Sequence, residues 1–262
     1  MDKIVIIGNG ISGVTAARHI RKNSDNEILI ISAETEHFFS RTALMYVYMG
    51  HMRFQDIKPY EDWFWEKNRI DLKFDRVEDI KTDVKELVMK SGSSITYDKL
   101  ILAVGSKPNK FGWPGQDLLG VQGLYSFQDV ESIEENSKNA KRAVIVGGGL
   151  IGVELAEMML YRGIAVTFLV RESKFWGNVL PEQEGQLISK HIKKHHVDLR
   201  FNTELDEIIA DENGRAKAVK TKDGEIIDCQ IVGLTAGVSP NVAFLKNTNI
   251  EIERGIKINK FL

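Results

Sequence analysis

Three glycines near the start of the chain have the spacing of a nucleotide-binding turn. Gly8, Gly10 and Gly13 follow a run of β-branched residues, 4–7, that is typical of a strand buried on both faces. In such a turn the first glycine permits a tight bend, the second lets a pyrophosphate approach the backbone, and the third lets the next helix pack closely. We expect that helix over residues 11–21, with its N-terminal amide groups directed at the phosphates.

An acidic residue stands where the adenosine ribose of a dinucleotide would need it. Residues 27–32 read as the second strand, and Glu34 lies about 20 residues beyond Gly13. A carboxylate at this place can accept hydrogen bonds from the ribose hydroxyls. The alternative is a solvated loop acid, and the strand–turn–helix–strand context favours the ribose contact.

The same pattern recurs in the middle of the chain. Residues 142–153 align with residues 3–14 without a gap, and they place Gly147, Gly149 and Gly152 in the same spacing. Two nucleotide-binding turns imply two nucleotides, or two halves of one redox pair.

Short strands follow each turn. The runs that read as antiparallel meanders are residues 85–90, 94–97 and 99–104 after the first turn, and 205–210, 216–221 and 225–234 after the second. Helices are expected over residues 126–136 and 182–196, and residues 255–262 read as a last strand. We therefore expect an α/β fold made of two Rossmann-like three-layer ββα nucleotide-binding domains, each with an antiparallel β-meander.

Composition narrows the class of protein. The 262 residues suffice for one large domain or two ordinary ones, and a net charge of −2 gives no bias toward nucleic acid or a membrane. No apolar run reaches the ~20 residues of a membrane helix, and the chain enters a strand at once, so we expect no signal peptide and a cytoplasmic location. Cys229 is the one cysteine, and we interpret it as a small buried residue. His191 and His195 have a spacing that can hold a metal, but no further acid or thiol motif supports it, so we expect no metal site.

The motifs resemble those of the two-dinucleotide flavoprotein reductases, the FAD-dependent, NAD(P)H-using pyridine nucleotide reductases. The carrying motifs are GNGISG at 8–13, AVGSKP at 103–108, GGGLIGVE at 147–154 and AGVSPN at 236–241. The subgroup that looks nearest includes ferredoxin, rubredoxin and nitrite reductase flavin subunits. The resemblance implies an FAD-binding domain formed by residues 1–110 and 240–262, and an NAD(P)H-binding domain formed by residues 111–239.

The resemblance also assigns site residues. FAD contacts are expected at Gly8, Gly10, Ser12, Gly13, Glu34, Arg41, Thr42, Val77, Ala103 and Gly105. NAD(P)H contacts are expected at Gly147, Gly149, Leu150, Ile151, Glu154, Arg171 and Gly237. Glu154 is the expected catalytic-site residue, with an orienting role near the nicotinamide.

Three departures from the family pattern affect these expectations. Residues 39–42 hold no thiol where the disulfide reductases carry reactive cysteines, so thiol-relayed chemistry is excluded. Tyr46 occupies the position at which many ferredoxin-type reductases have a lysine near the flavin. Family members continue beyond the equivalent of Leu262 into a segment whose aspartate binds the FAD ribityl chain, and then into an interface domain. We therefore expect the chain to be C-terminally truncated.

The expected function is transfer of a hydride from NAD(P)H to FAD, and then of electrons to an iron–sulfur protein or a small acceptor. Arg171 would suit the 2′-phosphate of NADPH, and Glu172 would suit the free 2′-hydroxyl of NADH; we favour NADH. The alternatives are a flavin-bound signalling module, a role that apoptosis-inducing factor shows for this fold, and a ligand-free remnant. The identity of the acceptor and the oligomeric state stay open.

Overall fold

The computed structural model describes residues 1–177 and 179–261, which divide into two units. Unit 1 contains Met1–Arg41, Arg53–Lys107 and Ser239–Leu262, and unit 2 contains Thr42–Met52 and Pro108–Val238. Leu262, which ends the expected FAD-binding domain, lies outside the described residues.

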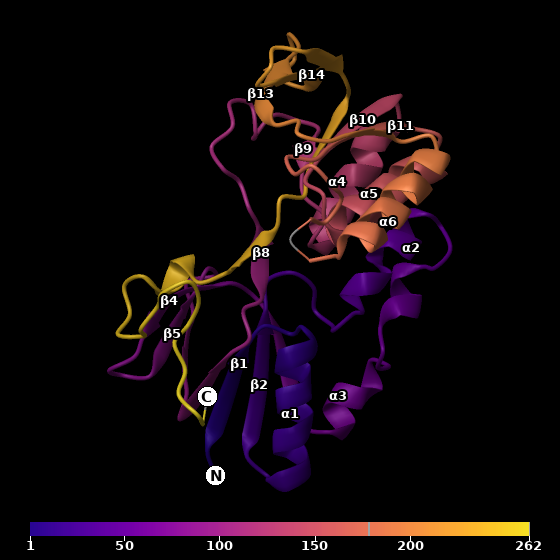
Figure 1. Ribbon diagram of the computed structural model, residues 1–262. Helices are drawn as coiled ribbons and strands as arrows, with labels where there is room; N and C mark the ends of the chain where they lie inside the picture. The colour runs from indigo at the N-terminus through magenta and orange to yellow at the C-terminus, as the bar shows by residue number, and fades with distance from the viewer. Residues whose placement is uncertain (178, 262) are drawn as a thin grey trace. The chain divides into compact units, whose positions relative to one another are not determined.

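Unit 1 is built on a parallel sheet whose two central strands are buried on both faces. Its order is β3-β2-β1-β7, with β1 (Lys3–Ile7), β2 (Glu27–Ser32), β3 (Ile70–Phe74) and β7 (Lys99–Leu102). In β1, Ile4 and Ile6 pack against α1 (Ile11–Asn23), while Val5 and Ile7 pack toward the opposite face. Burying each such side chain contributes about 1.5–3 kcal/mol. Helix α1 therefore lies along one face of the sheet, as Figure 1 shows.

The opposite face is covered by an antiparallel meander, β4-β5-β6. Its strands are β4 (Val77–Lys81), β5 (Glu86–Met89) and β6 (Ser94–Thr96). The prediction that residues 99–104 are its last strand was wrong, because β7 pairs in parallel with β1. The backbone amide of Asp98 donates to the Lys3 carbonyl, and the Lys3 amide donates to the Asp98 carboxylate, which starts β7 beside β1.

Unit 2 repeats this arrangement. Its parallel sheet has the order β12-β11-β10-β16-β9, with β9 (Val121–Gln122), β10 (Arg142–Val146), β11 (Ala165–Leu169), β12 (Asp198–Arg200) and β16 (Ile231–Leu234). The longer helices of unit 2 are α4 (Phe127–Ser137), α5 (Leu150–Tyr161) and α6 (Glu182–Lys194) (Figure 1). These helices and α1 confirm the predicted ones, with ends that shift by one or two residues.

The second meander corrects the sequence prediction in the same way as the first. Its strands are β13 (Leu205–Ala210), β14 (Ala216–Thr221) and β15 (Ile226–Asp228). The run 225–234 is two strands, because the chain leaves the meander after the Cys229 amide bonds to Lys217 and joins β10 where the Gln230 amide bonds to Arg142. Within the described residues, the predicted strand at 255–262 is reduced to a bridge between Ile252 and Ile256.

Short elements connect these layers. They are the 3-10 helices Arg41–Ala43, Phe54–Ile57 and Ala243–Leu245, the helices α2 (Leu44–Tyr48) and α3 (Trp63–Lys67), and the paired strands β8 (Ser106–Pro108) and β17 (Val238–Pro240). The predicted α/β fold with parallel sheets and meanders is confirmed. Among residues 1–177 and 179–261, no helix is both long and apolar enough to cross a bilayer.

Candidate functional site

The first glycine turn leaves room for a ligand at its middle glycine only. Gly8 has φ +109°, and a Cβ there would lie 2.1 Å from the Ala103 carbonyl oxygen. A Cβ at Gly13 would lie 2.0 Å from the Gly8 carbonyl oxygen. A Cβ at Gly10 would meet no described atom within 4 Å. The outer glycines are therefore required by packing, while Gly10 faces the open space that a pyrophosphate needs.

Helix α1 begins at this open space. Gly10 is its N-cap, and within the described chain no side chain caps the helix and no acidic residue lies in its first turn. The first amide groups of a helix have no intrahelical acceptor, and they bind anions well. Ser12 lies exposed in this first turn, as a phosphate contact would require.

Asn9 ties the turn to the acidic loop after β2. Its buried side-chain amide donates to the carbonyls of Thr35 (2.8 Å) and Glu36 (3.5 Å). Ser32 adds a second restraint, because its hydroxyl accepts a hydrogen bond from the Glu34 amide at 3.3 Å. Sequence reasoning missed Asn9, although a buried polar residue between two functional glycines was a signal that it bonds locally.

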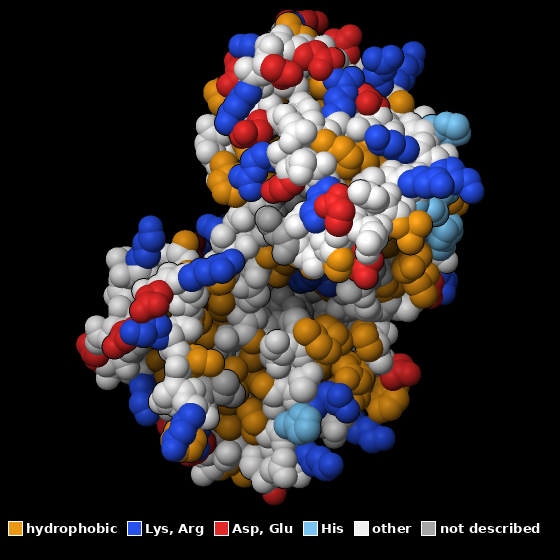
Figure 2. Space-filling model, viewed as in Figure 1, with side chains coloured by type: hydrophobic (Ala, Val, Ile, Leu, Met, Phe, Trp, Pro, Cys, Tyr) orange, Lys and Arg blue, Asp and Glu red, His pale blue; other side chains and the backbone are white. Residues whose placement is uncertain are grey.

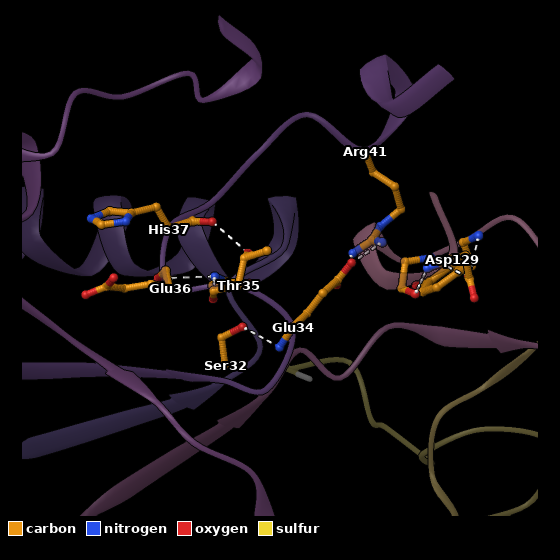
Figure 3. Close-up of polar contacts among 10 residues, drawn as sticks. Ser32, Glu34, Thr35, Glu36, His37, Arg41 and Asp129 are labelled. Atoms are coloured by element: carbon orange, nitrogen blue, oxygen red, sulfur yellow. Dashed lines mark hydrogen bonds and ion pairs between the residues drawn. The ribbon is translucent and has the colours of Figure 1, made fainter. Parts of the chain in front are cut away.

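Glu34 and Arg41, both predicted FAD contacts, lie side by side. The Arg41 guanidinium donates to the Glu34 carboxylate through Nη1 (2.9 Å) and Nη2 (2.6 Å), as the dashed lines of Figure 3 show. The same guanidinium lies 5.2 Å from the ring centroid of Phe39. This two-pronged pair fixes the orientation of the Glu34 carboxylate.

The remaining predicted FAD contacts differ in position and in how far their side chains are buried. Ala103 and Gly105 follow β7; the Ala103 amide bonds to the Ile7 carbonyl, so both come to the carboxyl end of β1. The Val77 side chain packs in the core of unit 1, so a ligand could meet only its backbone. Thr42 is exposed and belongs to unit 2.

The second turn reproduces the geometry of the first. Gly147 has φ +119°, and a Cβ there would lie 2.7 Å from the Thr235 carbonyl oxygen. A Cβ at Gly152 would lie 2.6 Å from the Phe168 ring, whereas one at Gly149 would meet no described atom within 4 Å. Gly149 is the N-cap of α5, and no described side chain caps this helix either. Leu150 is exposed and Ile151 half-buried at the helix start, as the predicted contacts require.

Two polar residues that the sequence did not single out hold the second turn. The buried Thr235 hydroxyl donates to the carbonyls of Val146 (3.1 Å) and Gly147 (3.3 Å). Asn109 bonds through its backbone amide to the Gly237 carbonyl and through its side chain to the Ala236 carbonyl. Gly237 has φ +87°, a conformation that favours glycine, so the backbone accounts for the glycine at this position.

Glu154 lies on α5, in the second helical turn. It is half-buried, and burial together with the charge of Glu157 raises its pKa above the ordinary value of 4.5. A carboxyl group with a raised pKa holds its proton at higher pH than an exposed one. In its protonated form Glu154 can donate a hydrogen bond, and in its ionised form it only accepts hydrogen bonds.

Arg171 and Glu172 follow β11, where a ribose acid is expected. Arg171 Nη2 lies 3.1 Å from Glu172 Oε1, and the side chain of Glu172 is 29% exposed against 69% for Arg171. The Glu172 carbonyl also accepts the Asn202 amide, which holds its backbone beside β12. Glu172 is thus the better fixed of the two side chains.

The one cysteine cannot act as a thiolate. Cys229 is fully buried in the core between the meander and the sheet of unit 2. Burial raises its pKa to about 12. The interpretation of Cys229 as a small core residue is confirmed.

Comparisons with known proteins agree on one family. The family described as pyridine nucleotide-disulphide oxidoreductase matches residues 2–262. The nitrite reductase [NAD(P)H] of Bacillus subtilis is 30% identical over 99% of this chain and 32% of its own length. The NADH-rubredoxin oxidoreductase of Clostridium acetobutylicum is 28% identical over 98% of this chain and 63% of its own length. The chain thus spans less than two thirds of each of these two relatives.

A solved structure shows the same fold. A ferredoxin reductase from Rhodopseudomonas palustris superimposes with a TM-score of 0.91 at 23% identity, covering 98% of this chain and 64% of the other. FAD and NAD(P)H are the cofactors of this family. The two turns fit them, because each presents an open middle glycine and an uncapped helix start to a dinucleotide pyrophosphate.

Proposed function

The chain belongs to the pyridine nucleotide-disulphide oxidoreductase family, and we propose that it acts as a flavoprotein reductase without a redox-active thiol. NAD(P)H would supply a hydride to FAD, and the electrons would pass to an acceptor. The observation that carries this proposal is the pair of glycine turns, each closed by packing at its outer glycines and open at its middle one.

Each unit takes one cofactor in this proposal. Residues 1–110 and 240–262 form the FAD-binding domain, and residues 111–239 form the NAD(P)H-binding domain. The support is local: Gly10 and the Glu34–Arg41 pair lie in unit 1, and Gly149, Glu154 and the residues after β11 lie in unit 2.

The protein's own residues bind and orient. When bound, the two cofactors supply the hydride and electron chemistry. The amide groups at the starts of α1 and α5 hold the pyrophosphates, and Glu34, fixed by Arg41, accepts hydrogen bonds from the adenosine ribose. Glu154 has an orienting role at the nicotinamide end. Cys229 takes no part, since its thiol is buried.

The acceptor is an electron-transfer protein or a small molecule in this proposal. The relatives are named for rubredoxin and for nitrite. On the face that Figure 2 shows, Lys and Arg side chains and Asp and Glu side chains are both present over each unit. We place the reaction in the cytoplasm, where reduced nicotinamide nucleotides are regenerated.

NADH is the proposed donor. Glu172 would accept the ribose hydroxyls, and its contact with Arg171 compensates the charge that would otherwise attract a 2′-phosphate. The Glu172→Gln variant removes that charge compensation. We expect its ratio of NADPH to NADH efficiency to rise roughly tenfold, which equals about 1.4 kcal/mol.

Anaerobic rapid mixing tests the whole proposal. The FAD-loaded protein is mixed with NADH and with NADPH in parallel, and loss of the oxidised flavin absorbance is followed. We expect loss with NADH at the higher efficiency. Unchanged absorbance with both nucleotides, in protein shown to contain FAD, would rule out the reductase.

A further inference from the structure

The segment 42–52 belongs by sequence to one unit and by packing to the other. The residues on either side of it, Arg41 and Arg53, lie in unit 1, whereas Thr42–Met52 clusters with unit 2. The segment is helical over most of its length, because the 3-10 helix Arg41–Ala43 runs directly into α2. A helical segment this short needs contacts with other elements to stay folded.

Tyr48, at the end of α2, makes such contacts with unit 2. Its side chain is 1% exposed, and its hydroxyl lies 2.6 Å from Ser137 Oγ on α4. Ser137 already donates its hydroxyl proton to the Ile133 carbonyl, so Tyr48 is the donor. Burial is the largest influence on the Tyr48 hydroxyl and raises its pKa.

Arg162 also contacts Tyr48, at its ring and its backbone carbonyl. Its guanidinium lies 4.0 Å from the centroid of the Tyr48 ring, and its Nη2 donates to the Tyr48 carbonyl at 2.6 Å. The same Nη2 lies 3.1 Å from Glu134 Oε1 on α4. One guanidinium therefore engages the ring and the backbone of α2 together.

The two ends of this arrangement are functional in the proposed reductase. Arg162 is the C-cap of α5, whose N-terminus forms the second glycine turn. At the other end, Thr42 is joined by one peptide bond to Arg41, which orients the Glu34 carboxylate at the first turn. Arg41 and Thr42 belong to one 3-10 helix, Arg41–Ala43, which continues directly into α2.

We propose that Arg162 is a positioning residue for the FAD ribose acid, acting through the 42–52 segment on the Arg41–Glu34 pair. The inference rests on the proposed function for its ligand. The backbone path from α2 through Thr42 to Arg41 does not depend on the proposed function. Arg162 touches neither Arg41 nor Glu34 in this scheme, and its effect reaches them along the chain.

The test compares two substitutions at one ion pair. Arg162→Met keeps much of the aliphatic stem and removes both contacts with Tyr48. Glu134→Gln removes the charge of the other Arg162 partner and leaves the contacts with Tyr48 in place. Should Arg162→Met not fold, Arg162→Lys is used instead, since it keeps a charge but loses the planar fork.

Hydrogen exchange gives the first readout, on the ligand-free chain. In Arg162→Met we expect faster exchange of the amides of residues 34–41 as well as 42–52, with residues 142–161 unchanged. Glu134→Gln should match the wild type. Unchanged exchange over residues 34–41 in Arg162→Met, or an equal increase in Glu134→Gln, would overturn the inference.

FAD affinity gives the second readout. We expect the dissociation constant of Arg162→Met for FAD to rise roughly 3- to 10-fold, within the range of coupling through packed side chains, and that of Glu134→Gln to stay. A wild type that binds FAD and an Arg162→Met variant that binds it equally well would overturn the inference. A wild type that binds no FAD contradicts the proposed function instead, and the exchange data alone then decide the role of Arg162.

Discussion

Gly10 and Gly149 are positions at which a substitution should weaken ligand binding with little effect on stability. Both have negative φ values that alanine adopts, and both face open space, so a methyl group costs the helix start about 1 kcal/mol or less. That methyl group would occupy the space of a pyrophosphate. We expect Gly10→Ala to weaken FAD binding and Gly149→Ala to weaken nicotinamide binding, each roughly tenfold or more.

Each of these variants is the control for the other. Calorimetric titration of both variants with FAD and with NADH measures the four affinities. Loss of the same ligand in both variants, or of neither, would contradict the assignment of one cofactor to each turn.

Glu154 makes a prediction about pH. Its pKa is raised in the folded protein, so on raising the pH the unfolded chain releases this proton first. Stability from this group is therefore present below pH 4.5 and is lost as the pH rises through the folded-state pKa. We expect Glu154→Gln to match the wild type in thermal midpoint at about pH 4 and to exceed it at about pH 8.

Glu131→Gln, at an exposed position of α4, serves as the control for Glu154→Gln. If the difference in thermal midpoint between Glu154→Gln and the wild type does not grow with pH, burial of Glu154 is not its cause. The same would follow if Glu131→Gln showed the same growth.

At the residue scale, the spacing of glycines in the sequence was enough to predict the two turns. It placed Gly8, Gly13 and Gly147 where packing demands glycine. It missed Asn9 and Thr235, because their roles depend on carbonyl groups that only the folded turn brings within reach.

Helix α4 supports the packing of α2, because it carries Ser137, which bonds to Tyr48, and Glu134, which pairs with Arg162. It begins with a capping box, in which Ser126 Oγ accepts the Asp129 amide at 3.1 Å and the Asp129 carboxylate accepts the Ser126 amide at 2.8 Å. We expect Ser126→Ala to lower the free energy of unfolding by about 1 kcal/mol. Ser126→Thr, which keeps the acceptor, should stay within about 0.5 kcal/mol of the wild type.

Urea unfolding followed by circular dichroism measures this difference. Equal midpoints for Ser126→Ala and Ser126→Thr would show that the hydroxyl contributes nothing to the helix start.

Element types were predictable, and strand partners were not. The runs 99–104 and 225–234 were assigned to meanders because short apolar runs look alike in a hairpin and in a parallel sheet. What separates them is pairing with β1 and β10, which lie far away in sequence. The excursion of α2 into unit 2 was likewise invisible, because it depends on the partners of Tyr48.

For the whole molecule, the repeated order of turn, helix and meander is the main constraint on function. Each copy places a glycine turn at the carboxyl ends of two adjacent parallel strands, β1 and β7 in unit 1, and β10 and β16 in unit 2. Ligands of open α/β sheets bind at this edge. From the two copies we expect two independent dinucleotide sites, each of which should respond to its own ligand.

Hydrogen exchange with each ligand added separately checks this independence. FAD should slow exchange at residues 8–13, 34–41 and 103–105, and NADH should slow it at 147–152, 171–172 and 237, because bound phosphates and riboses occupy those amides. Gly10→Ala should erase the first footprint and leave the second, and Gly149→Ala should do the reverse. A single footprint common to both ligands would mean that one turn is structural only, and the chain would then hold one nucleotide and could not pass a hydride between two.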